Sequence, residues 1–230
     1  GALFRIPLAN LIGAEGMAIY QSAYSIYLVL FVISTAGLPV AISKMVSEAH
    51  ALNNDEEAFN VFSVSYRLLF IIGIVGTVIL MAGAKTISSS MGAPDVYPAL
   101  MALAPSLLFV SVSSVYRGYF QGRHNMMPTA ISEVIEALFK LFIGLALAYA
   151  LISMGSAGSA TGAILGVTTG ALGSALYLIF YYIKGKNKSI LAKTGLERKK
   201  KNKLLKTIIY IAVPVTLGSS VFTLTSTIDT

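Results

Sequence analysis

The segment MPTAISEVIEALFKLFIGLALAYALI, residues 127–152, combines a long apolar stretch with three charged side chains. It is longer than the ~20 residues that an α-helix needs to cross the hydrocarbon core of a bilayer. Glu133, Glu136 and Lys140 recur at helical spacing, which places all three on one face of the helix. The segment therefore predicts a membrane-spanning helix with one lipid-facing side and one polar side.

The depth of these charges decides what the polar side can face. At a rise of 1.5 Å per residue, Glu133 lies about 9 Å, Glu136 about 13 Å and Lys140 about 20 Å from the helix start. Each charge exposed to lipid would cost on the order of 2.5–3.5 kcal/mol, so the polar side must face protein or water. Two interpretations remain open. In the first, Glu136 and Lys140 form an ion pair with each other that helps to link helices. In the second, they line a hydrated cavity that binds an ionic substrate or a coupling ion.

The rest of the chain is equally apolar. Of its 230 residues, 56% are hydrophobic and 12% are charged, with a mean hydropathy of +0.77, whereas a soluble domain carries about 25% charged residues. Stretches long enough to span a bilayer lie at 17–43, 58–83, 97–119, 127–152, 156–183 and 204–228. These stretches predict an all-α, polytopic membrane helix bundle with short connecting loops.

The charge distribution predicts the orientation of this bundle. The net charge is +7, and the basic residues are concentrated at 184–203, in KGKNKSILAKTGLERKKKNK. A short basic loop between two spans is typical of the cytoplasmic side of a membrane, so this run indicates topology rather than nucleic-acid binding. The same bias makes loops 44–57 and 121–126 cytoplasmic, and loops 1–16, 84–94 and 153–157 external.

Small residues and prolines predict how the helices pack. In GSAGSATGAILGVTTGALGSAL, residues 155–176, glycine or serine recurs every four residues from Gly158 to Ser174, a ridge that allows helices to approach closely. Pro39 and Pro214 lie within predicted spans, where they are equally consistent with hinges and with packing kinks. Tyrosines near predicted helix ends are expected to form an interfacial belt: Tyr20, Tyr24, Tyr116, Tyr119, Tyr181 and Tyr182.

Catalysis finds little support in the sequence. There is no cysteine, no phosphate-binding GxxxxGK loop and no HExxH pattern, and His50 and His124 lie in separate predicted loops. The acidic run NNDEE, residues 53–57, is interpreted as a solvated loop and helix start rather than as part of a metal site. We therefore expect no enzyme, no metal site and no cofactor, apart from a possible coupling ion such as H⁺ or Na⁺.

Further charged residues favour a cavity over an isolated pair. Arg5, Arg67, Arg117 and Asp229 lie within or beside predicted spans. Arg67 and Arg117 are near enough to the cytoplasmic face to extend toward it. A single buried ion pair would not require such neighbours, so Arg5, Arg117, Glu133, Glu136, Lys140 and Asp229 are the candidate substrate-binding residues.

Several motifs resemble a known family. GAEG (13–16), STAGLPVAISK (34–44), RGYFQG (117–122) and MMPTAIS (126–132), together with the paired Glu and basic residue that follow, occur in the order typical of one branch of the MOP superfamily. That branch comprises sporulation protein VB-like and MurJ-like polysaccharide exporters. The resemblance covers essentially the whole chain.

The resemblance implies a MATE-like transporter of about fourteen helices in two lobes around a central cavity. Residues 1–203 would form the N-terminal six-helix lobe, with its first helix largely missing and a basic inter-lobe loop at 184–203. Residues 204–230 would begin the C-terminal lobe. The implied activity is flipping an undecaprenyl-pyrophosphate-linked glycan, such as lipid II, across the bacterial cytoplasmic membrane by alternating access, as a monomer of the full-length chain among membrane lipids.

The resemblance also implies roles for individual residues. Arg5, in FRIPLA, matches an arginine at the end of the first helix, and a cavity arginine of this kind would contact the pyrophosphate. Glu133 stands where a neutral polar residue is expected. Three other functions stay open: a cation-coupled multidrug exporter of the same superfamily, a membrane-embedded enzyme of glycan assembly, and a structural partner in an envelope complex.

Overall fold

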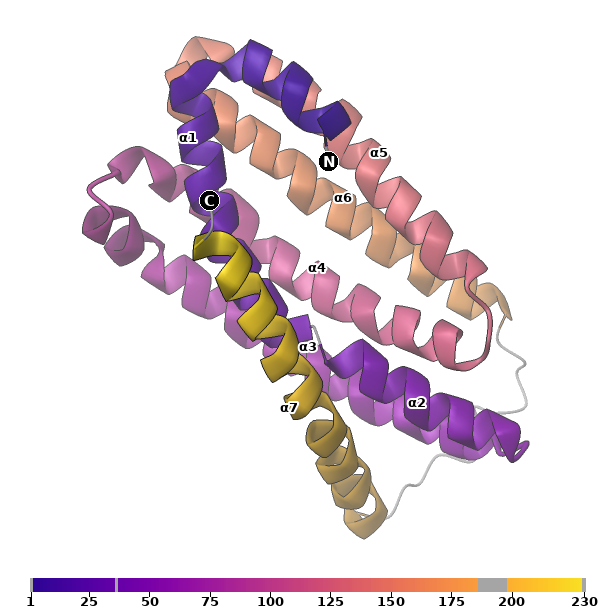
Figure 1. The fold of residues 1–230 in the computed structure, drawn as a ribbon. Coiled ribbons are helices and arrows are strands. Elements are labelled where there is room, and N and C mark those ends of the chain that lie inside the picture. Colours follow the sequence, from indigo (N-terminus) through magenta and orange to yellow (C-terminus); the bar gives the residue numbers. More distant parts are fainter. Residues whose placement is uncertain (1, 36, 186–197, 229–230) are drawn as a thin grey trace.

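The computed structural model describes residues 2–35, 37–185 and 198–228, which form a bundle of α-helices (Figure 1). Within these ranges there is no strand, so the predicted all-α class is confirmed. The helices are α1 (Ala2–Thr35), α2 (Leu38–Ala51), α3 (Asp55–Ser90), α4 (Tyr97–Gly122), α5 (Met127–Ala150), α6 (Gly155–Gly185) and α7 (Arg198–Ile228), with short 3-10 helices η1 (Pro94–Val96) and η2 (Ile152–Met154) before α4 and α6.

Helices α5 and α6 run side by side and make the most extensive helix contact of the bundle (Figure 1). A Cβ atom on Gly166 would collide with the backbone of Gly144, and one on Gly170 would lie 2.7 Å from the carbonyl oxygen of Glu136. Glycine at these positions is therefore what lets the two backbones touch. The predicted small-residue ridge is confirmed, and it places the α5 backbone at Glu136 directly against α6.

The first helix bends sharply at Gly13. Its φ of 69° lies in the left-handed region that residues with a Cβ rarely adopt, so Gly13 separates an arm at 2–12 from the longer part at 14–35. The sequence predicted an external loop at 1–16, and this is wrong for the described residues, which are helical from Ala2. A single glycine is enough to turn the chain, so helix continues on both sides.

The predicted span 17–43 is divided into two helices. Helix α1 ends at Thr35 and α2 begins at Leu38, with Pro39 in the first turn, where its missing N–H group costs nothing. Pro39 therefore starts a helix instead of kinking one. The Gly37 N–H donates a hydrogen bond of 3.1 Å to the Thr216 hydroxyl of α7, and a Cβ on Gly37 would collide with the carbonyl of Ala212. Helix α7 thus packs against this break.

Two predicted loops are shorter than expected because the helices continue through them. The predicted loop 44–57 is helical up to Ala51, and the predicted loop 84–94 is helical up to Ser90. The Asn54 side chain accepts a hydrogen bond of 3.0 Å from the Glu57 N–H and caps α3, whose first turn is acidic. The interpretation of NNDEE as a loop and helix start is confirmed.

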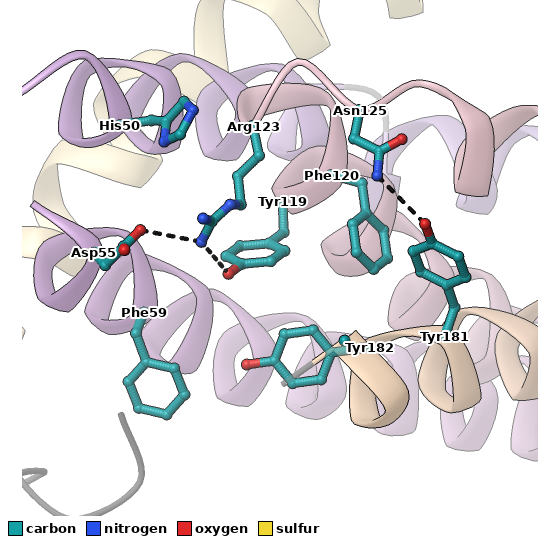
Figure 2. Close-up of a pocket in the computed structure, with 10 residues that line it drawn as sticks. His50, Asp55, Phe59, Tyr119, Phe120, Arg123, Asn125, Tyr181 and Tyr182 are labelled. Atoms are coloured by element: carbon teal, nitrogen blue, oxygen red, sulfur yellow. Dashed lines mark hydrogen bonds and ion pairs between the residues drawn. The ribbon is translucent and has the colours of Figure 1, made fainter. Parts of the chain in front are cut away.

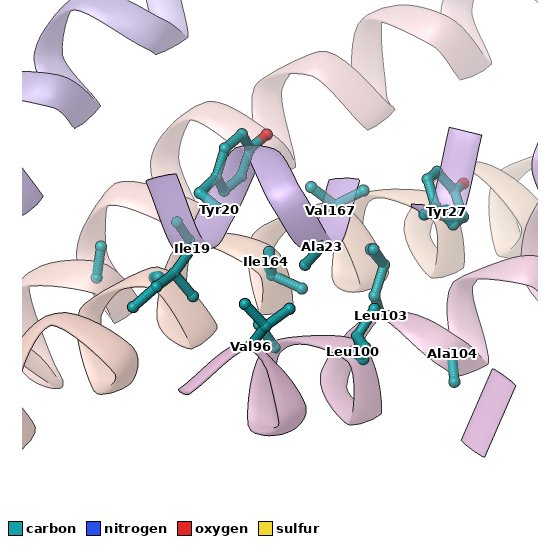
Figure 3. Close-up of a cluster of buried hydrophobic side chains, with 14 of the residues drawn as sticks. Ile19, Tyr20, Ala23, Tyr27, Val96, Leu100, Leu103, Ala104, Ile164 and Val167 are labelled. Carbon is teal, nitrogen blue, oxygen red and sulfur yellow. The ribbon is translucent and has the colours of Figure 1, made fainter. Parts of the chain in front are cut away.

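Two hydrophobic clusters fill the bundle. The first joins α1, α4 and α6 around fully buried side chains such as Leu100, Leu103 and Ile164 (Figure 3). The second joins α2, α3, α4 and α7 around Ile42 and Leu69. Helix α4 contributes to both clusters, as α3 and α6 also do, and it contacts each of α1, α2, α3, α5 and α6, which makes it the central helix of the fold.

The predicted interfacial tyrosine belt is wrong at several positions. Tyr20 is only 2% exposed, Tyr116 is 6% exposed and Tyr119 is 9% exposed, so their rings pack inside the bundle. Tyr181 is 36% exposed, as an interfacial belt requires. The inward rings occupy volume that aliphatic side chains would otherwise fill, and each brings a hydroxyl into the interior.

Three helices of the described chain are long and apolar enough to cross a membrane: α3, α4 with η1, and α6 with η2. Helix α5, at 24 residues, also reaches the required length but carries Glu133, Glu136 and Lys140. Its polar side must therefore be accommodated by neighbouring helices.

We expect the substitution Gly166→Ala to destabilise the protein by about 1–3 kcal/mol, because the new methyl group meets α5 backbone that has no room to move. Thermal unfolding in detergent measures the effect. The matched control is Gly83→Ala in α3, where the nearest atom to a new Cβ is a side-chain methyl at 3.5 Å. Equal melting temperatures for both variants would contradict the close α5–α6 contact.

Candidate functional site

Arg117 and Glu136 form an ion pair inside the bundle. The Arg117 Nη2 atom of α4 donates to Glu136 Oε2 of α5 at 2.9 Å and to the Ser174 hydroxyl of α6 at 2.9 Å, and its Nε donates to the Ser132 hydroxyl at 3.1 Å. The side chains of the pair are 18% and 34% exposed. The sequence placed Arg117 near enough to the cytoplasmic face to extend toward it; in the structure it turns inward and links α4, α5 and α6.

The local sequence explains how these groups meet. Ser132 and Glu136 are one helical turn apart on α5, and Ser174 continues the glycine ridge of α6 that lets α5 approach. The Ser132 hydroxyl accepts from Arg117 and donates to the Thr129 carbonyl at 2.7 Å, so both of its roles are used. A fork of guanidinium donors suits this arrangement because it reaches several acceptors at once.

Lys140, one turn further along α5, has aromatic partners. Its Nζ atom lies 4.7 Å from the centre of the Tyr24 ring and 5.3 Å from that of Phe4. Cation–π contacts of this kind stabilise an ammonium group without neutralising it. Within the described residues, the ion-pair partner of Glu136 is Arg117. The Glu136–Lys140 pair considered from the sequence is therefore not formed.

Beside these residues lies a cavity of about 90 Å³ between α1, α5 and α6. Its wall combines the two charged residues of α5 with aromatic and aliphatic side chains: Tyr24, Tyr27, Leu28, Phe31, Glu136, Lys140 and Val167. The volume is enough for a few water molecules. We call the space lined by these seven residues the interior cavity.

A row of aromatic rings on α1 borders the interior cavity. Phe4, Tyr20, Tyr24, Tyr27 and Phe31 follow one another with centroid separations of 6.1, 5.7, 5.8 and 5.7 Å. This row was not predicted, because Tyr20 and Tyr24 were expected at the membrane interface. The signal was present, since residues 20, 24, 27 and 31 are spaced four, three and four apart and share one helix face.

The remaining predicted site residues are distributed more widely. Arg5 is exposed on the short arm of α1 and lies within range of electrostatic interaction with Lys140. Glu133 is exposed on α5, one turn before Glu136. Arg67 is exposed on α3, away from the cavity lining, and Asp229 lies outside the described residues. The structure thus brings Arg117, Glu136 and Lys140 together, with Arg5 nearby.

The arrangement of these helices corresponds to about half of each of several solved MATE structures, at 16–18% identity. Solved structures share this fold. A MATE transporter in the bent conformation has a TM-score of 0.79 at 17% identity, covering 95% of this chain and 49% of that one. The inward-facing conformation of a multidrug resistance MATE family transporter of the MOP superfamily has a TM-score of 0.76 at 17% identity, covering 97% and 51%.

The chain belongs to the family described as polysaccharide biosynthesis protein, whose profile matches residues 1–230. Stage V sporulation protein B of Bacillus subtilis (strain 168) is 32% identical over 180 residues, which are 77% of this chain and 35% of the relative. Lipid II flippase MurJ of the same organism is 29% identical over 204 residues, 84% of this chain and 37% of the relative. The chain thus spans about a third of the length of these curated relatives.

We expect Arg117→Met and Glu136→Met each to destabilise the protein by about 1–3 kcal/mol, because each leaves a charged partner partly buried without its ion pair. The double variant should be closer to the unmodified protein than either single one, since no unpaired charge remains. Chemical or thermal unfolding of all four proteins gives the coupling energy. Strictly additive effects would show that the pair does not act as a unit.

Proposed function

We propose that the full-length protein flips an undecaprenyl-pyrophosphate-linked glycan, lipid II or a related polysaccharide precursor, from the cytoplasmic to the outer leaflet of the bacterial cytoplasmic membrane. Two lobes would alternate access to a central cavity. Helices α1 to α6 would supply most of one lobe. Helix α7 (Arg198–Ile228) would begin the second lobe; it starts inside the predicted loop 184–203, so that loop is shorter than expected, and α6 likewise continues to Gly185. The family and the relative named as a lipid II flippase support this proposal.

The proposal rests on one observation: of the charged side chains at the interior cavity, Glu136 is paired with Arg117, whereas Lys140 contacts aromatic rings. Arg117 pairs with Glu136 at 2.9 Å, while the Lys140 Nζ atom faces the aromatic ring of Tyr24 at 4.7 Å. Arg5 is exposed nearby, so two cations outnumber the exposed carboxylate of Glu133. A pyrophosphate crossing a low-dielectric core needs such cations, because hydrogen bonds between charged groups offset the cost of removing it from water.

The same contacts argue against an exporter of cationic drugs. A cationic substrate favours an acidic or aromatic cavity wall. The carboxylate of the interior cavity is Glu136, which is already bound by Arg117, and the Tyr24 ring of the wall already receives the ammonium group of Lys140. The similarity to MATE transporters, at 16–18% identity, concerns the fold alone. An anionic substrate is therefore the better match.

We expect Lys140→Gln and Arg5→Gln in the full-length protein each to lower the rate of flipping about ten-fold or more, because a hydrogen bond to a charged group contributes about 1.5–3 kcal/mol. The measurement is the appearance of a lipid-linked glycan in the outer leaflet of proteoliposomes.

The control is Lys85→Gln, which removes the same charge from an exposed position of α3 outside the interior cavity. It should flip at the unmodified rate. If both Lys140→Gln and Arg5→Gln fold and flip normally, the pyrophosphate does not use these cations and the assignment is wrong.

A further inference from the structure

A second and larger cavity, of about 430 Å³, lies at the opposite end of the bundle from the bend at Gly13, where α2, α4 and α6 end and α3 begins (Figure 2). We name it the end cavity. None of its lining residues belongs to the interior cavity. Its volume is in the range of small-molecule binding sites, about 300–1,000 Å³.

Much of the wall of the end cavity is aromatic. Phe59, Tyr119, Phe120, Tyr181 and Tyr182 come from α3, α4 and α6. Tyr119 and Tyr182 meet edge to face at 5.5 Å and 78°, and Phe120 and Tyr181 do so at 5.4 Å and 82°. Tyr182 also stacks on Phe62 at 4.7 Å, and the Arg123 guanidinium lies over the Tyr119 ring at 5.8 Å. These contacts hold the rings in place, and Tyr181, at 36%, is the most exposed of the five.

The polar side of the end cavity is formed by His50, Asp55, Arg123 and Asn125, which Figure 2 shows around the same open space as the rings. The Arg123 Nη1 atom lies 3.2 Å from Asp55 Oδ1 and donates to the Tyr119 hydroxyl at 3.0 Å. The Asn125 amide points at the Tyr181 hydroxyl at 3.5 Å, the outer limit of a hydrogen bond. Donors and acceptors therefore alternate around the rings.

Among the described lining residues of the end cavity, the charged groups Arg123 and Asp55 are paired with each other, which favours a neutral ligand over an anion. Burial alone would lower the pKa of the Arg123 guanidinium, but the Tyr119 hydroxyl and the Asp55 carboxylate raise it above its ordinary value. Arg123 is thus charged and already paired, and the formal charges of Arg123 and Asp55 cancel. A phosphate would have to compete with Asp55 for the guanidinium, whereas a neutral ligand leaves the pair intact.

We propose that the end cavity binds a neutral sugar ring. A pyranose has a face of C–H groups, whose partial positive charge suits the negative face of an aromatic ring, and a rim of hydroxyls that both donate and accept. Aromatic walls with Asp, Asn, Arg and His side chains at their edge match both features. That this sugar is the glycan headgroup, held on the cytoplasmic side before it is flipped, rests on the function proposed above.

Ligand-observed saturation-transfer NMR tests this proposal on the full-length protein in phosphatidylcholine nanodiscs. The probes are glucose, galactose and N-acetylglucosamine. Inorganic pyrophosphate, the anionic alternative, has no C–H protons to observe, so its binding is followed separately by the broadening of its phosphorus-31 signal. We expect transfer to at least one sugar, strongest at its ring protons. Tyr181→Ala should weaken that transfer about five-fold or more by removing a stacking face. Tyr181→Phe, which keeps the ring and removes the hydroxyl, should retain most of the signal.

The matched control is Phe180→Ala, which removes a neighbouring ring that is 66% exposed and outside the end cavity. It should leave sugar binding unchanged. The proposal is overturned if no sugar receives transfer, if pyrophosphate alone binds, or if folded Tyr181→Ala and Phe180→Ala bind equally. If the protein binds a sugar but does not flip a lipid-linked glycan, the proposed function is wrong and the sugar site stands. If it flips the glycan but binds no sugar, the sugar site is wrong and the proposed function stands.

Discussion

The contact between α5 and α6 is the constraint on which the arrangement of the charged interior depends. Because Gly166 and Gly170 have no side chains, the α5 backbone rests directly on α6. This proximity brings Ser132 and Glu136 of α5 within reach of Ser174, and all three meet the guanidinium of Arg117 from α4. A bulkier ridge would separate α5 from α6 and leave a carboxylate facing an apolar environment, which is costly.

The pairing of Glu136 with Arg117 has a consequence for its neighbour on α5. Lys140 is left to the ring faces of Tyr24 and Phe4, which stabilise its charge but do not cancel it. The lobe therefore combines an ion pair that links α4 and α5 with a lysine that is held against aromatic rings. The Glu136–Lys140 pair considered from the sequence is thus replaced by a Glu136–Arg117 pair, and the binding of an ionic substrate at Lys140 stays a prediction.

Aromatic side chains serve two separate regions of this lobe. On α1, the row from Phe4 to Phe31 borders the interior cavity and receives the ammonium of Lys140. At the other end, rings of α3, α4 and α6 form the wall of the end cavity. In a chain with 12 tyrosines and no tryptophan, these rings supply hydroxyls as well as apolar surface to the interior.

The sequence by itself determined the helical class, the two-sided character of α5 and the glycine ridge of α6, because hydropathy, charge spacing and small-residue spacing are local and periodic. It also carried the motifs of the family to which the chain belongs. It did not determine the ends of helices such as α2 and α3, or the direction in which Tyr20 and Tyr119 point. Only the tertiary structure decided that Glu136 pairs with Arg117, 19 residues away on another helix, instead of with Lys140 one turn away. The physical reason is that spacing along one helix limits which groups share a face, whereas the choice of partner depends on which donors the neighbouring helices bring to that face.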